Sequence, residues 1–245
     1  MIPKKIHYFW FGKSNKPEIV LKYIESWKKY FPEYEIIEWN ESNFNVNCCE
    51  YTKQAYEAKK YAFVSDYARI YILYNIGGIY FDTDIEVCKS FDDLLKERKM
   101  VLGFEDNHYV LTAFMASKSG MECFKYLLDK YQSKSFLIKN GKYDTLPNPV
   151  IVTEVIEKCG LVPNGQHQVF DAECEIYPYE YFSAFNIPKQ TLMVTEKTYS
   201  IHHCMGTWQT KREKFKPWVK SKIIIFIGEN VFNSIKNKFY KSRKE

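Results

Sequence analysis

Residues 77–87 read GGIYFDTDIEV, an apolar run that ends in two carboxylates separated by one residue. The run is typical of a buried strand, and in extended backbone residues two apart face the same side, so Asp82 and Asp84 can converge on one point. Open α/β sheets bind ligands at the carboxyl ends of such strands. Because hard divalent cations take oxygen ligands and bind substrate phosphates as well, the stretch predicts a metal site. A D-x-D pair alone is also typical of a solvated acidic turn.

Immediately upstream, residues 62–76 (AFVSDYARIYILYNI) show the apolar spacing of a helix, with Ser65 able to cap its start and the glycine pair able to end it. Asp66 and Arg69 lie three residues apart, and therefore on one helical face. Two interpretations of this pair stay open. It is an ordinary local ion pair, or both side chains point toward the hydroxyls or phosphate of a bound nucleotide sugar.

The chain opens with a predicted strand, helix and second strand. Residues 4–12 (KKIHYFWFG) and 33–40 (EYEIIEWN) have the apolar content of strands, and residues 17–31 carry apolar side chains at helical spacing. Strands separated by one helix predict a parallel sheet with helices on its faces. Further strands are predicted at 100–105, 109–117 and 198–208, and further helices at 121–132 and 148–159.

The expected architecture is therefore one Rossmann-like α/β domain over residues 1–210, with a distinct tail at 211–245. The tail mixes many lysines and arginines with apolar clusters. We expect it to be helical, and either to pack on the domain or to lie on an anionic membrane surface.

The composition favours a reduced, soluble protein. The seven cysteines form no C-x-x-C pair, which argues against a disulfide framework and against a structural zinc site. The N-terminal apolar run is too short for a secretory signal, and no segment approaches the length of a membrane span. The formal net charge of +5 suits an anionic substrate or a membrane surface without requiring either. We expect a cytoplasmic location, with peripheral contact at the inner face of the membrane as an option, and no nucleic-acid partner.

Three further side chains are candidates for the same site. His202 and His203 are adjacent, so on a strand they face opposite sides, and only one easily joins the Asp pair as a third metal ligand. The glycine turn that follows favours His203. Trp10 ends the first predicted strand; such a Trp is usually part of the core, but its ring can also stack on a nucleotide base.

The blocks IPKKIHYFWFG, YAFVSDYARIYILYNIGGIYFDTDIEV and YSIHHCMGTW, spread over residues 2–208, resemble the ordered motifs of the family 32, capsule-type glycosyltransferases, which carry a D-x-D sugar-binding region. That family is distantly related to yeast α-mannosyltransferases and to the clostridial glucosylating toxins. The resemblance implies a GT-A fold, a nucleotide-sugar donor with UDP favoured, Mn²⁺ or Mg²⁺ as cofactor, and transfer of a hexose with retention of the anomeric configuration. It also implies a glycan or lipid-linked oligosaccharide acceptor in surface polysaccharide synthesis.

The resemblance further implies roles for single residues. The reaction centre is expected to contain Asp66, Arg69 and Asp82. The metal is expected to bind Asp82, Asp84 and His203, the last in an H-x-x-G pattern with Gly206. Trp10 is expected to stack on the base, and Trp208 to close over the diphosphate. The other expected substrate-binding residues are Phe9, Ser65 and Tyr80.

The chemistry would place positive charge on the anomeric carbon, and a nearby negative group would stabilise it. The candidates for that group are Asp66, Glu105 and Asp106. Two alternatives to a transferase stay open. A metal-dependent phosphoesterase could use the same Asp pair, but it would be expected to show more ligands than a chain with five histidines suggests. A non-catalytic glycan-binding module would fit the acids and aromatics, but would not explain their combination with the Asp/Arg helix.

Overall fold

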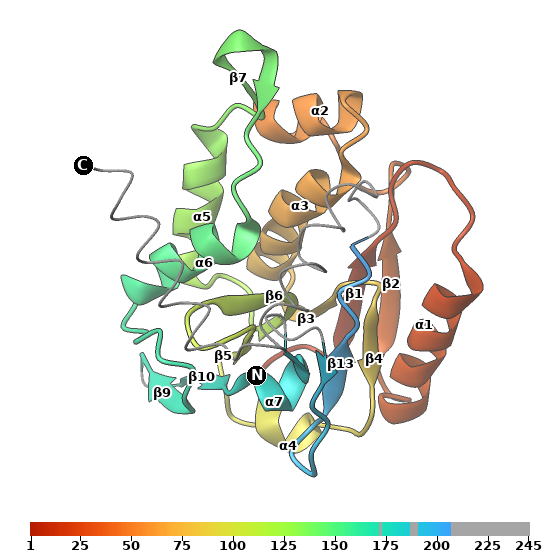
Figure 1. The fold of residues 1–245 in the computed structure, drawn as a ribbon, viewed down its shortest axis with the longest axis vertical. Coiled ribbons are helices and arrows are strands. Elements are labelled where there is room, and N and C mark those ends of the chain that lie inside the picture. Colours follow the sequence, from red (N-terminus) through yellow and green to blue (C-terminus); the bar gives the residue numbers. More distant parts are fainter. Residues whose placement is uncertain (172, 187–190, 207–245) are drawn as a thin grey trace, which may run out of the picture.

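The computed structural model describes residues 1–171, 173–186 and 191–206 (Figure 1). Trp208 and the predicted tail at 211–245 lie outside the described residues. None of the helices in the described part of the chain is long and apolar enough to cross a membrane.

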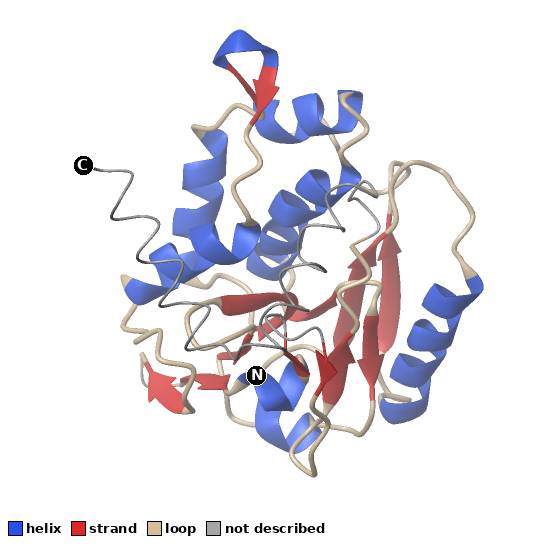
Figure 2. Cartoon of the chain, viewed as in Figure 1, coloured by secondary structure: helices blue, strands red, loops and turns tan. Residues whose placement is uncertain are grey.

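A seven-stranded sheet forms the centre of the molecule (Figure 2). In spatial order its strands are β2 (Glu35–Trp39), β1 (Lys5–Phe9), β3 (Gly78–Phe81), β6 (Val110–Ser117), β5 (Met100–Phe104), β10 (Cys174–Tyr177) and β9 (Gln168–Phe170). The pairings give β2, β1, β3, β5 and β10 one direction, and only β6 and β9 run the opposite way. The predicted α/β fold with a mainly parallel central sheet is confirmed.

Helices cover both faces of this sheet and bury two separate apolar cores. The first core contains side chains of α2 (Glu50–Glu57), α3 (Tyr61–Asn75), α5 (Glu122–Gln132) and α6 (Asn148–Glu157). The second contains side chains of α1 (Glu18–Tyr30), α4 (Asp92–Leu95) and α7 (Tyr179–Phe182). Strand β3 shows the alternation that separates them, because Tyr80 enters the first core while Ile79 and Phe81 enter the second.

Three two-stranded sheets complete the fold of the described residues. One pairs β4 (Ile85–Val87) with β13 (Ser200–His202) in antiparallel fashion, which brings the end of the described chain beside the D-x-D turn. The second pairs β11 (Phe185–Asn186) with β12 (Thr191–Leu192). The third is a hairpin of β7 (Leu137–Ile138) and β8 (Lys142–Tyr143), joined by a 3-10 turn at Lys139–Gly141.

The glycine pair connects α3 to β3 through backbone that other residues rarely adopt. Gly77 and Gly78 have φ values of 74° and 110°. A Cβ on Gly78 would lie 2.7 Å from the carbonyl oxygen of Lys5, so β1 and β3 can approach each other only with glycine there.

The prediction that Ser65 caps this helix is wrong. The helix begins at Tyr61, a full turn earlier, and the Ser65 hydroxyl donates a hydrogen bond to the Tyr61 carbonyl 3.2 Å away. A serine inside a helix commonly bonds to the carbonyl four residues back. The extra turn is stabilised by Phe63, whose ring lies 5.0 Å from that of Phe136.

Candidate active site

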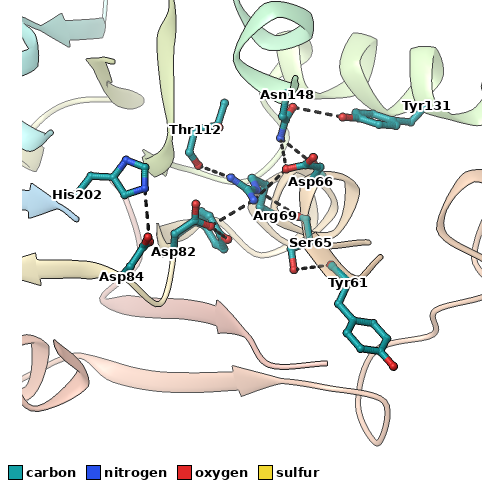
Figure 3. Close-up of polar contacts among 11 residues, drawn as sticks. Tyr61, Ser65, Asp66, Arg69, Asp82, Asp84, Thr112, Tyr131, Asn148 and His202 are labelled. Atoms are coloured by element: carbon teal, nitrogen blue, oxygen red, sulfur yellow. Dashed lines mark hydrogen bonds and ion pairs between the residues drawn. The ribbon is translucent and has the colours of Figure 1, made fainter. Parts of the chain in front are cut away.

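A buried arginine organises one half of the site, which we name the inner cluster (Asp66, Arg69, Tyr80, Asp82 and Asn148; Figure 3). Arg69 Nη2 lies 3.0 Å from Asp66 Oδ1 and 3.2 Å from Asp82 Oδ1. Its Nη1 donates to the Thr112 carbonyl at 2.7 Å. The arginine side chain is only 5% exposed, so these contacts replace water around the guanidinium.

Asp66 lies on the far side of this arginine from the D-x-D turn. Burial raises its pKa to about 6, against the opposing charge of Arg69 and with a further upward contribution from Asp82. Asn148, the first residue of α6, donates from Nδ2 to Asp66 Oδ1 at 3.1 Å and accepts from the Tyr131 hydroxyl at 3.3 Å. Asp66 is thus held by two elements that are far apart in the sequence.

Asp82 directly follows β3, and one of its carboxylate oxygens, Oδ1, interacts with two side chains of the protein. The Tyr80 hydroxyl donates a short hydrogen bond to Asp82 Oδ1, the same oxygen that pairs with Arg69. The tyrosine ring also lies 4.6 Å beneath the guanidinium carbon. Within the described residues the hydrogen bonds and ion pairs of the Asp82 side chain are made by Oδ1, which leaves Oδ2 for a ligand.

Asp84 forms a second half of the site, the outer cluster (Asp84, His202 and Cys204). Its Oδ2 accepts from the Met205 amide at 2.8 Å, and its Oδ1 lies 3.4 Å from His202 Nε2. Cys204 Sγ lies 3.5 Å from the other nitrogen of that ring. Burial alone would raise the pKa of Asp84, but the charge of His202 and the Met205 amide lower it.

The expected orientation of the two histidines is reversed in the structure. His202 ends β13 directly opposite Ile85, so the antiparallel pairing places its ring beside Asp84. His203 lies past the strand; its ring stacks on Tyr23 at 4.7 Å, and its Nε2 lies 2.8 Å from Glu86 Oε2. The strand register, and not the H-x-x-G spacing, decides which histidine faces the acids.

A potential metal site lies where the two clusters meet. One ligand atom each from Asp82, Asp84 and His202 lie within 4.8 Å of one another. Two carboxylate oxygens and an imidazole nitrogen are a donor set that fits Mn²⁺ or Mg²⁺, with water or phosphate completing the coordination. The residues present are therefore compatible with a divalent cation.

The two candidate acids after β5 differ in their surroundings. Asp106 Oδ1 accepts from the amides of His108 and Tyr109 at 2.7 and 2.9 Å, so it stabilises the turn between β5 and β6. The Glu105 side chain makes no hydrogen bond within the described residues. Its pKa rises to about 7, chiefly because it is buried, with His202 opposing the shift and Asp106 and Asp82 adding to it. Glu105 is therefore near enough to the outer cluster to feel its charges, and it can change protonation near neutral pH.

The aromatic residues at the end of β1 separate into two environments. Trp10 lines an open hollow of about 310 Å³, together with polar side chains of segments 13–16 and 38–42. Its Nε1 donates to the Ser14 carbonyl at 2.6 Å. Phe9 does not line this hollow, contrary to expectation. It is buried in the first core against Phe11, Phe44 and Tyr80, because neighbouring strand residues point to opposite sides.

Sequence reasoning missed two contributors to the inner cluster. The Thr112 carbonyl accepts from Arg69, but a backbone acceptor leaves no signal in a side-chain pattern. Asn148 was predicted only as the first residue of a helix, although its side chain donates a hydrogen bond to Asp66.

Comparisons with known proteins identify the same region. Residues 17–101 match the family described as "Glycosyltransferase sugar-binding region containing DXD motif". The fold is similar to that of a solved structure titled "PaToxG Glycosyltransferase", with a TM-score of 0.51 and 19% identity over 64% of this chain and 68% of that chain. Another similar structure is a glycosyltransferase involved in the glycosylation of the major capsid of PBCV-1, with a TM-score of 0.44 and 10% identity over 82% of this chain and 94% of that chain. No curated protein sequence matches the chain.

The matched segment contains the three charged residues of the inner cluster, Asp66, Arg69 and Asp82, and the one acid of the outer cluster, Asp84. The fold in which they lie is the one seen in a glycosyltransferase structure. Together, the family match and the shared fold support a glycosyltransferase.

Proposed function

We propose that the protein transfers a hexose from a nucleotide sugar, with UDP as the favoured nucleotide, to a hydroxyl group of a glycan or lipid-linked oligosaccharide. The observation that carries the proposal is the convergence of Asp82, Asp84 and His202 within 4.8 Å beside a buried arginine. The family resemblance at the D-x-D region adds family 32 membership, retention of configuration and a role in surface polysaccharide synthesis to the proposal.

In this proposal the outer cluster holds the diphosphate end of the donor. A divalent cation, Mn²⁺ before Mg²⁺, would neutralise the charge that develops on the departing diphosphate. Asp82 Oδ2, Asp84 and His202 would hold it. Because Tyr80 and Arg69 already fix Asp82 Oδ1, the second oxygen is presented in a constant position and needs little reorganisation on binding.

The inner cluster and Glu105 would act on the sugar. The bond between the anomeric carbon and the diphosphate oxygen breaks and its electron pair leaves with the diphosphate, a bond to the acceptor oxygen forms, and the acceptor hydroxyl gives its proton to the departing diphosphate or to water. Asp66 would contact the sugar hydroxyls, while Arg69 orients Asp66 and Asp82. Glu105 is a better candidate than Asp106 for the group near the anomeric carbon, because Asp106 is already bonded to two backbone amides.

Trp10 would stack on the base at the other end of the donor. The hollow that it lines opens beyond the ends of β1 and β2, and its polar walls offer hydrogen-bonding groups to the base and ribose. Trp208 and the tail at 211–245 are proposed to close over the diphosphate and to contact an anionic membrane, respectively. The proposed location is the cytoplasm, at the inner face of the membrane.

Calorimetry with UDP and GDP, each with and without Mn²⁺, tests the proposal. We expect UDP to bind only when Mn²⁺ is present, and Asp84→Asn to abolish that binding. Glu86→Gln is the matched control, because Glu86 lies two residues further along and pairs with His203 instead of the site. A glycan-binding module would ignore both nucleotides. A phosphoesterase would cleave the diphosphate of a UDP-sugar to UMP and sugar 1-phosphate, whereas a transferase acting on water would release UDP and free sugar.

A further inference from the structure

The β7–β8 hairpin projects from the molecule beyond α2, at the top of Figure 1. Four large apolar side chains in and beside it are strongly exposed: Leu137 at 46%, Ile138 at 44%, Tyr143 at 41% and Leu146 at 44%. Leu137 pairs with Tyr143, and Ile138 pairs with Lys142. Since alternate strand residues point to opposite sides, apolar groups lie on both faces of the projection.

The hairpin is also locally cationic. Residues 133–147 contain three lysines and one acid, and the acid, Asp144, pairs with Lys134 at 2.8 Å. Lys139 and Lys142, which border the tip, are exposed and make no ion pair with any described residue. The end of the hairpin therefore combines exposed apolar side chains with two uncompensated positive charges.

The base of the projection is firmly attached to the domain. Phe136 is fully buried, and its ring lies 5.0 Å from Phe63 of α3 and stacks on Tyr143 at 5.0 Å. Gln54 Oε1 accepts from the Leu137 amide at 2.7 Å and from the Ser135 hydroxyl at 2.8 Å. The exposed hairpin, with its apolar strand residues and basic tip, is thus held out from the surface by specific contacts.

We propose that this hairpin docks the protein on a membrane of anionic lipid, with Leu137 and Ile138 entering the interface and Lys139 and Lys142 meeting lipid phosphates. Two observations favour a bilayer over a protein partner. The feature is a narrow projection, whereas a stable protein interface buries about 800 Å² of each partner. In addition, its combination of apolar and basic residues complements an anionic interface.

The hairpin is directly connected to the candidate active site. Phe63, which packs on its base, lies one turn before Asp66 in α3, and Asn148 begins α6 just after the hairpin's second strand. Docking through this element would fix the orientation of α3 and α6 relative to the membrane. The proposal itself depends on no catalytic activity, so it stands or fails independently of the proposed function.

Vesicle binding by the full chain provides the test. Vesicles of phosphatidylglycerol mixed with phosphatidylcholine are compared with pure phosphatidylcholine at low ionic strength. Each lysine near an anionic surface contributes to the free energy of binding. The double variant Lys139→Gln, Lys142→Gln should therefore lower the partition coefficient about thirtyfold. The double variant Leu137→Ser, Ile138→Ser should also lower vesicle binding. It should do so at low and at high salt, because salt does not screen the burial of apolar side chains. The contributions of separate segments to the free energy of vesicle binding add. The ratio of variant to parent partition coefficient is therefore expected to be the same if another segment of the chain also binds the vesicle.

Matched controls separate the hairpin from general surface effects. Val162→Ser removes an apolar residue that is 58% exposed elsewhere, and Lys158→Gln removes an exposed lysine directly after α6; both variants should bind vesicles like the parent. Hydrogen exchange should slow at residues 137–143 when anionic vesicles are added. Parent-like binding by both hairpin double variants would overturn the proposal. Hairpin-dependent self-association without lipid would overturn it too, and would identify a protein partner.

Discussion

The inner and outer clusters use similar residues but differ in how completely the protein itself satisfies them. Arg69 in the inner cluster makes four polar contacts, to two carboxylates and to the carbonyls of Ser65 and Thr112, at 2.7 to 3.2 Å. In the outer cluster, Asp84 Oδ1 and His202 Nε2 approach only to 3.4 Å, and the Asp82 carboxylate beside them makes its hydrogen bonds and ion pairs with described residues through Oδ1 alone. The inner cluster is therefore held rigidly by contacts within the protein, whereas the outer cluster has polar groups that a bound ligand would satisfy.

The largest expected effect comes from removing the centre of the inner cluster. Arg69→Met would leave Asp82, and the largely buried Asp66 at pH above its pKa, without the cation that pairs with both. We expect the free energy of unfolding to fall by about 3–5 kcal/mol, measured by urea denaturation. Asp66→Asn should cost much less, because the pKa of Asp66 is already raised to about 6 and asparagine keeps the acceptor for Asn148. An equal loss in the two variants would show that Arg69 is not the centre of the cluster.

In the outer cluster, the effect should fall on activity instead of stability. Asp84→Asn should lower hydrolysis of a UDP-sugar by about a hundredfold or more, because a group that acts on developing charge is lost. The midpoint of thermal unfolding should change little, since asparagine can still accept a hydrogen bond. EDTA should abolish the activity of the parent and Mn²⁺ should restore it. Full turnover in excess EDTA would remove the metal from the mechanism.

The two histidines give a matched pair for the next prediction. His202→Ala should weaken Mn²⁺ binding about tenfold to a hundredfold, a range typical when a metal site loses a supporting contact or a ligand. His203→Ala should leave Mn²⁺ binding unchanged, because its ring stacks on Tyr23 and pairs with Glu86. Titration calorimetry of both variants distinguishes them, and the opposite ranking would contradict the β13 register.

The smallest effect is expected at the base end of the donor. Trp10→Ala should weaken UDP binding about tenfold, within the range measured for base stacking, and Trp10→Phe should retain most of the affinity. If both variants bind UDP like the parent but unfold at lower temperature, Trp10 stabilises the fold, through its hydrogen bond to the Ser14 carbonyl, and does not bind the ligand.

The sequence predicted the main helices and strands of the fold because short-range patterns along the chain define them. The opening strand, helix and strand appear as β1, α1 and β2, and residues 62–76 correspond to α3. Apolar spacing and glycine stops report on local backbone, which is why these elements could be recognised. Seven small strands were not predicted, since runs of two to four residues carry too little pattern: β4, β7, β8, β9, β10, β11 and β12.

The sequence alone also placed Asp66 and Arg69 on one helical face, because fixed spacing along a helix determines direction, and it placed Asp82 and Asp84 at a strand end. The expected extended backbone at the two acids is wrong, since they lie in the turn between β3 and β4, where strand alternation does not set their directions. Only the tertiary structure decided which groups these side chains meet. Asn148 reaches Asp66, and His202 instead of His203 reaches Asp84, through contacts between segments 82 and 118 residues apart. Such contacts depend on how α6 packs against α3 and on the register of β13 against β4. The packing of separate segments, which no local spacing encodes, completes the site.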